Sequence, residues 1–183
     1  MRPGAWSECG FLGETESLRE VLESDAATLV ELGITATALA ETLGVLIRAP
    51  DAIYARRFRD RFDGRFDELP PRLERHAEAA YEAVVERFGS LDVPEVGAVV
   101  VGDRYEVSEL MYLGLQDCPW GSSTGKTCGS ASRDWRIRNT VRDLELRGSH
   151  LIVHLIGDHG FFEGHGSPYR TDPRALAELL ELV

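Results

Sequence analysis

The sequence predicts an α+β fold in which a helical array precedes a small antiparallel sheet packed with helices. In the first ninety residues, apolar side chains recur at spacings of three and four, which is typical of amphipathic helices. From residue 98 onward, short runs of alternating apolar and charged residues are separated by turn residues, which is typical of strands. We therefore divide the chain into a helical part (1–90) and a part with sheet and helices (97–183), which can also form one continuous domain.

Helix boundaries are marked by capping residues in the helical part. A first helix is expected over residues 14–32, because Gly33 follows the last apolar position. Thr35 is placed to cap a second helix. Residues 51–66 carry an aromatic side chain at every fourth position, and Pro71 is placed to open a further helix.

The second part is expected to alternate strands with helices. Strands are predicted for residues 98–101, 105–115, 135–139 and 144–146. Ser149 is expected to cap a short helix over residues 150–156. Asp172, followed by Pro173 at the first helical position, is expected to begin the last helix.

Composition narrows the classes of function. Lys and Arg number 20 against 31 Asp and Glu, a net charge of −11 that disfavours nucleic acid as the partner. No apolar run approaches the ~18 residues that a membrane span needs. The first residues lack the pattern of an export signal, and three cysteines cannot all pair. We therefore expect a cytoplasmic protein with free or metal-bound thiols and no membrane association.

Two cysteines and two histidines form the strongest candidate site. Cys118 and Cys128 flank the loop between two predicted strands, and His154 and His159 lie on or just after the following helix. Zinc prefers such a tetrahedral set, commonly with three to five residues between the histidines. The ββα order resembles a Cys₂His₂ zinc finger, although nine residues separate the cysteines here instead of two to four. We expect a structural zinc rather than a catalytic one.

Other residues near this group have candidate roles. His150 and His165 are alternative metal ligands, and Asp158 and Glu163 are candidate acceptors that orient a metal-bound imidazole. Without a metal, the same cysteines would be small buried apolar residues and the histidines ordinary polar ones.

Two charged regions allow weaker hypotheses. Arg136 and Arg138 alternate with apolar residues on a predicted strand, and are a candidate binding surface for a small anionic ligand. The loop around Lys126 ends like a phosphate-binding loop, but it has three residues between its glycines where four are needed. The arginines interleaved with phenylalanines in residues 56–66 are more typical of a packed helix than of a single-strand nucleic-acid surface.

The sequence therefore supports two functions. The first is a zinc-stabilised interaction module without catalysis, which meets a protein or a small anionic ligand. The alternative is a metal-dependent hydrolase in which His150, His154 and His159 hold the zinc and Cys118 or a water lies nearby. Nucleotide binding at the Lys126 loop is a third and weaker hypothesis.

Overall fold

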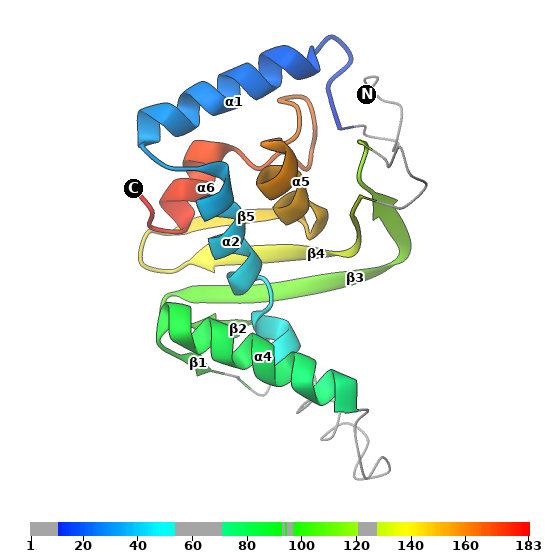
Figure 1. Cartoon of the computed structure of the whole chain (residues 1–183). Coiled ribbons are helices and arrows are strands. Elements are labelled where there is room, and N and C mark those ends of the chain that lie inside the picture. Colours follow the sequence, from blue (N-terminus) through cyan, green and yellow to red (C-terminus); the bar gives the residue numbers. More distant parts are fainter. Residues whose placement is uncertain (1–10, 54–70, 93, 95–96, 121–127) are drawn as a thin grey trace.

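A computed structural model describes residues 11–53, 71–92, 94, 97–120 and 128–183 of the chain. Within these residues five helices accompany a five-stranded antiparallel sheet, which confirms the α+β prediction (Figure 1). The helices are α1 (Leu18–Leu32), α2 (Ala36–Leu46), α4 (Pro71–Phe88), α5 (Leu151–His159) and α6 (Pro173–Leu179). A further helical stretch at residues 49–53 follows α2.

The sheet is a meander in which each strand pairs with the next along the chain. Its order is β1-β2-β3-β4-β5, and every pair is antiparallel. The strands are β1 (Leu91–Asp92), β2 (Val99–Val101), β3 (Tyr105–Asp117), β4 (Ser130–Asn139) and β5 (Leu144–Ser149). Such connections need only short turns, and Asp103 and Asp143, both at positive φ, occupy two of them.

Alternation along β4 separates a buried face of the sheet from a charged one. Trp135, Ile137 and Asn139 are buried, whereas Arg136 and Arg138 between them are exposed. The buried face belongs to one apolar core that also contains α2, α5 and α6, so residues of both predicted parts share it. α4 lies across β1 and β2 (Figure 1).

Most helix ends agree with the capping residues in the sequence. Thr35 accepts a hydrogen bond from the N–H of Ala38, and Gly33 ends α1 at a φ of 69°. Asp172 caps α6 with Pro173 at its start. The predicted cap of α5 is displaced by one residue: His150 is the capping residue, while the Ser149 hydroxyl accepts from the N–H of Leu151.

Two predicted helices differ in extent. The first begins at Leu18 rather than residue 14, because residues 14–17 form a turn in which the N–H of Glu16 donates to the carbonyl of Gly13. The predicted aromatic helix is described only at its beginning, since residues 54–70 lie outside the described part of the chain.

A large bulge bends the hairpin of β3 and β4. Met111 pairs with Arg133 and Gln116 with Ala131, so four residues of β3 lie opposite a single residue of β4. Extra residues in one strand kink it. Figure 1 shows β3 turning at this end of the sheet, which carries the tip of the hairpin toward α5.

Glycines allow α2 and α5 to approach closely. A Cβ atom on Gly44 would lie 3.2 Å from Cγ1 of Val153, and one on Gly157 would lie 3.3 Å from Cβ of Ala40. The apolar faces of both helices are buried in the core beside this contact. The contact therefore fixes the position of α5, which carries two of the candidate metal ligands.

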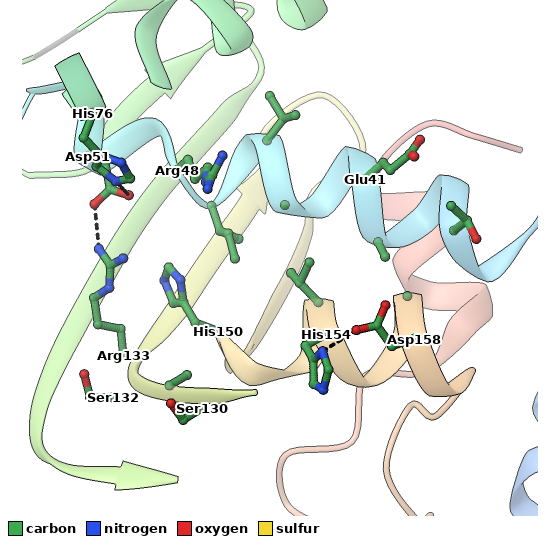
Figure 2. Close-up of a pocket in the computed structure, with 18 of the residues that line it drawn as sticks. Glu41, Arg48, Asp51, His76, Ser130, Ser132, Arg133, His150, His154 and Asp158 are labelled. Carbon is green, nitrogen blue, oxygen red and sulfur yellow. Dashed lines mark hydrogen bonds and ion pairs between the residues drawn. The ribbon is translucent and has the colours of Figure 1, made fainter. Parts of the chain in front are cut away.

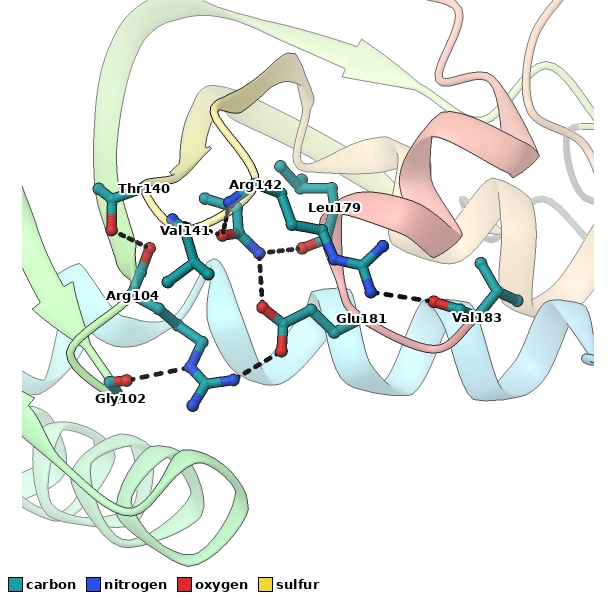
Figure 3. A network of polar contacts seen from close by, with 9 residues as sticks. Gly102, Arg104, Thr140, Val141, Arg142, Leu179, Glu181 and Val183 are labelled. Carbon is teal, nitrogen blue, oxygen red and sulfur yellow. Dashed lines mark hydrogen bonds and ion pairs between the residues drawn. The ribbon is translucent and has the colours of Figure 1, made fainter.

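Polar contacts fasten the end of the chain to the sheet (Figure 3). The side-chain amide of Asn139 donates to the carbonyl of Leu179 and to the Glu181 carboxylate. Glu181 also accepts from Arg104 at 2.6 Å. The end of α6 is thus tied to the turns of two hairpins.

No single helix in the described residues has the length and apolar character to cross a membrane. The segments Leu18–Leu32 and Ala36–Ile53 meet this test only as a pair, and the pair is bent by 86°.

Candidate metal centre

The tip of the β3–β4 hairpin positions both thiols. Beyond the last paired residues of the strands, the N–H of Cys118 donates to the carbonyl of Gly129 at 2.7 Å. This bond holds the two ends of the intervening loop together. Cys118 is buried and Cys128 is exposed.

Helix α5 supplies both imidazoles. His159 is its last residue, and Gly160 ends the helix at a φ of 61°, a conformation that glycine adopts without strain. The rings of His154 and His159 lie edge to face with centroids 5.0 Å apart. Although five residues apart, they therefore reach the same space beside the hairpin tip.

The four side chains converge at distances that fit one metal ion. The Sγ atom of Cys118 lies 3.4 Å from Nε2 of His159. The Sγ atom of Cys128 lies 3.3 Å from Nε2 of His154 and 3.5 Å from that of His159. One ligand atom from each of the four residues lies within 4.8 Å of all the others. Ligands on one tetrahedral zinc, at bond lengths of about 2.0–2.3 Å, are separated by about 3.3–3.8 Å.

Asp158 orients one of these rings. Its carboxylate lies 2.6 Å from Nδ1 of His154, one helical turn away along α5 (Figure 2). A proton held at Nδ1 leaves the lone pair of Nε2 free to bind a metal. Asp158 therefore lies at the position from which a carboxylate can accept a hydrogen bond from Nδ1 of a metal-bound His154.

Trp120 covers the other ring. Its indole is stacked on the imidazole of His159 with centroids 4.3 Å apart and planes only 3° from parallel. Burial and the neighbouring His154 lower the pKa of His159, which favours the neutral, metal-binding form. Trp120 was not a candidate from the sequence; its one signal there is its place two residues after Cys118.

A glycine makes room for the His154 ring. A Cβ atom on Gly129 would lie 2.6 Å from Cδ2 of His154 and 2.9 Å from its Nε2. Real Cβ atoms do not approach so closely, so this imidazole lies directly against the backbone of the hairpin. In the sequence, the one signal for this role is that Gly129 directly follows Cys128.

The alternative ligands lie outside this group of four. Nε2 of His150 lies 3.9 Å from the carboxylate of Glu109, and burial lowers the pKa of His150 to about 4. His165 is exposed, and the N–H of the next residue, Gly166, donates to the Glu16 carboxylate. The carboxylate of Glu163 accepts a hydrogen bond from Ser167 instead of an imidazole.

The two arginines predicted to bind an anion are engaged in ion pairs on the charged face of the sheet. Arg136 lies 2.7 Å from Glu145, and Arg138 lies 3.0 Å from Asp143. These carboxylates compete with any anionic ligand for both guanidinium groups. The Lys126 loop and the arginines of residues 56–66 lie outside the described residues, so both hypotheses remain predictions from sequence.

A groove of about 1020 Å³ borders the metal centre between α2, α5 and β4 (Figure 2). His154 lines it at one end. At the other end Arg133 is held by Asp51 at 2.6 Å and by Glu109 at 3.0 Å. Nε2 of His150 is buried there and has no hydrogen-bond partner among the described residues.

Comparison of the chain with protein-family models, with curated proteins and with solved structures gives no match.

Proposed function

We propose that this chain is an interaction module whose hairpin tip is fastened to α5 by a structural zinc ion. The ligands are Cys118, Cys128, His154 and His159. The single observation that carries the proposal is the convergence of their four ligand atoms within 4.8 Å of one another. The partner we expect is a protein or a small anionic ligand.

The donor set favours zinc in a structural role. Two thiolates and two neutral imidazoles complete a tetrahedron, which leaves no position for a water or substrate. The ligands also come from two separate elements, the bent hairpin tip and α5, which are far apart along the chain because β4 and β5 lie between them. An ion at this place would couple the tip to the core.

Zinc content and stability test the proposal. Purified protein should carry about one zinc per chain by elemental analysis. At a free zinc concentration of about 1,000 times the dissociation constant, binding stabilises the fold by about 4 kcal/mol. Removing the metal with a chelator should therefore lower Tm by about 8–16 °C for a chain of this size.

Single cysteine variants locate the ion. Cys118→Ser and Cys128→Ser should lose zinc and show the lower Tm without chelator, because metal binding is coupled to folding. Cys9→Ser is the matched control, since Cys9 is the third cysteine of the sequence, and it should keep zinc and Tm. Zinc-free protein with an unchanged Tm would contradict the structural role.

A metal-dependent hydrolase is the second candidate, and the groove that reaches His154 favours it. Such an enzyme needs three protein ligands and an open position for water. Cobalt substitution separates the two functions. A closed site with two thiolates should give a tetrahedral cobalt spectrum that does not change when small anions are added. A spectrum that shifts with anions, together with hydrolysis of an aryl ester or phosphate that His154→Ala abolishes, would favour the enzyme.

A further inference from the structure

Two carboxylates hold the guanidinium of Arg133 at one end of the groove. Nη1 of Arg133 donates to Asp51 at 2.6 Å and to Glu109 at 3.0 Å. Both N–H bonds of Nη1 are thereby used, and the guanidinium is fixed in one orientation. Arg133 lines the groove from β4, and its side chain is 28% exposed (Figure 2).

The other edge of this guanidinium is not used by the protein. Nε and Nη2 of Arg133 donate no hydrogen bond to any of the described residues, since both bonds of the side chain start at Nη1. These two atoms form the planar fork that can bind both oxygens of a carboxylate. Arg136 and Arg138 differ, because each of them uses Nη2 for its own ion pair.

His150 and Arg48 lie at the same end of the groove (Figure 2). The N–H of His150 donates to the carbonyl of Arg133 at 2.8 Å, which fixes the two residues beside each other. Nε2 of His150 is buried without a hydrogen bond in the part of the chain that the structure describes, which is uncommon for a buried polar atom. The exposed guanidinium of Arg48 makes no ion pair with a described residue. The polar groups at this end therefore keep bonding capacity that the protein does not use.

Apolar side chains line the groove as well. Val45 and Val153 belong to the facing helices α2 and α5, and Leu115 and Ala131 belong to the hairpin. The volume of about 1020 Å³ lies at the upper end of the range of small-molecule pockets, about 300–1,000 Å³. Such pockets combine apolar walls with a few polar groups that orient the ligand.

We propose that this groove binds a small monocarboxylic acid with an apolar body, and that the Nε–Nη2 edge of Arg133 holds its carboxylate. The apolar body lies between α2 and α5, against Val45 and Val153. Arg48 supplies a second positive charge at the mouth of the site. This inference deepens the proposed interaction function and rests on it for the kind of partner, a small anionic ligand, but it requires no zinc ion.

The charges at this end of the groove fit an anion with a single charge. The guanidinium groups of Arg133 and Arg48 balance the carboxylates of Asp51 and Glu109, and both carboxylates contact Nη1 rather than the unused edge. Burial raises the pKa of Glu109, which weakens its repulsion of an anion. The net charge of −11 belongs to the whole chain, and charges farther than about 8 Å from the ligand are largely screened at physiological salt.

Titration of the full-length, zinc-loaded chain with hydrocinnamate, followed by NMR of the arginine Nε–H groups, tests the inference. We expect saturable binding with a dissociation constant at or below about 1 mM, which is ordinary for a ligand of this size. The Nε–H signal of Arg133, identified by its absence from the spectrum of Arg133→Lys, should shift with occupancy. Hydrocinnamamide, which has the same body without the charge, should bind at least about tenfold more weakly.

Arginine variants locate the carboxylate. Arg133→Lys should weaken hydrocinnamate binding at least about tenfold, because lysine keeps the positive charge beside Asp51 and Glu109 but has no fork. Arg138→Lys is the matched control, since it makes the same exchange on the charged face of the same strand, and it should bind like the unsubstituted chain. Arg48→Gln, at an exposed position, should weaken binding about two- to fivefold, and it provides the test if Arg133→Lys does not fold.

Several results would overturn the inference. One is the absence of saturation at about 10 mM hydrocinnamate, and another is equal binding of the amide. Equal affinities of Arg133→Lys and Arg138→Lys, or a shift confined to the signals of other arginines, would place the carboxylate elsewhere. Tighter binding of an acetylated tripeptide that ends in phenylalanine would assign the groove to the carboxylate of a peptide instead of a small acid.

Zinc content measured on the same samples separates this inference from the proposed function. Zinc-loaded protein that does not bind hydrocinnamate refutes the carboxylate site and leaves the metal centre standing. Protein that is purified without zinc and binds hydrocinnamate does the reverse. Arg133→Lys should retain its zinc, because Arg133 is not one of the four ligands.

Discussion

The carboxylate of Asp158 lies 2.6 Å from Nδ1 of His154, and Nε2 of the same ring lies 3.3 Å from Sγ of Cys128. The imidazole thereby has a polar partner on both sides, and a proton on Nδ1, toward the acid, leaves the lone pair of Nε2 directed to the sulfur. Residues four apart on a helix face each other, so α5 sets this geometry by its own spacing. In the proposed zinc site, Asp158 is therefore a positioning residue that acts through His154.

Asp158→Asn should weaken zinc binding without removing a ligand. Partners of metal-bound imidazoles usually contribute about 10–100-fold to affinity, because they fix the tautomer and the basicity of the ring. Competition with a chromogenic chelator measures this change. Asp143→Asn is the control, since Asp143 is an exposed partner of Arg138 in the turn between β4 and β5, at the opposite end of β4 from Cys128, and the zinc affinity of this variant should equal that of the unsubstituted chain. Equal affinities for both variants would show that Asp158 has no role in orienting the ring.

Gly129→Ala should disrupt the centre by steric conflict alone. Its Cβ would lie 2.6 Å from Cδ2 of His154, so the ring or the hairpin tip must move. We expect at least a tenfold loss of zinc affinity and a lower Tm. Gly114→Ala is the matched control because it meets open space on the same hairpin, and its zinc affinity should be unchanged. Unaltered affinity in Gly129→Ala would mean that the ring is not held against the hairpin.

The ligand residues could be recognised in the sequence, but the way they are brought together could not. Cysteine and histidine are the side chains zinc prefers, and their concentration after residue 117 made them candidates. A wide gap between the cysteines removes the short turn of a zinc finger. Here the pairing of β3 with β4 is interrupted at residues 112–115, and the sequence of these residues is a continuous apolar run that also occurs in regular strands. A bulge is a mismatch in the pairing of two strands, so it cannot be predicted from the sequence pattern of one strand alone.

Contacts between elements that are distant in sequence could likewise not be predicted. Helix ends were predictable because caps act locally, as Thr35 and Asp172 do. Gly44 and Gly157 are different. A glycine inside a helix lowers the stability of that helix, so the sequence alone gives no reason for it. The reason is the second helix, which packs closely against each of these glycines. Trp120 likewise has no local pattern, since its partner His159 lies 39 residues away in sequence.

Asp25→Asn should cost about 3–5 kcal/mol of unfolding free energy. Asp25 on α1 is buried and accepts two hydrogen bonds from Arg170, at 2.6 and 3.2 Å. Removing one charge leaves the mostly buried guanidinium without its main counter-charge, which is expensive in a low dielectric. Denaturant titration measures the change. Glu23→Gln breaks only the exposed pair with Arg19 and should alter stability by less than about 1 kcal/mol. Similar values for both variants would contradict the role of the buried pair.

Glu163→Gln should change how stability depends on pH. Burial raises the pKa of Glu163 from 4.5 to about 7 in the folded chain, with a smaller opposing effect of Ser167. The folded state therefore holds a proton that the unfolded state releases between these values, and the associated stability is present below pH 4.5 and lost as pH rises through 7. Above that pH the substitution should stabilise the protein by up to about 3 kcal/mol relative to its effect at pH 4.

The difference in unfolding free energy between Glu163→Gln and the unsubstituted chain, measured from pH 4 to pH 8, isolates this group from all others that titrate. The difference should grow in favour of the variant across that range and level off above pH 7. A flat difference for Glu163→Gln would mean that the carboxyl of Glu163 ionises normally, and that its burial carries no electrostatic cost.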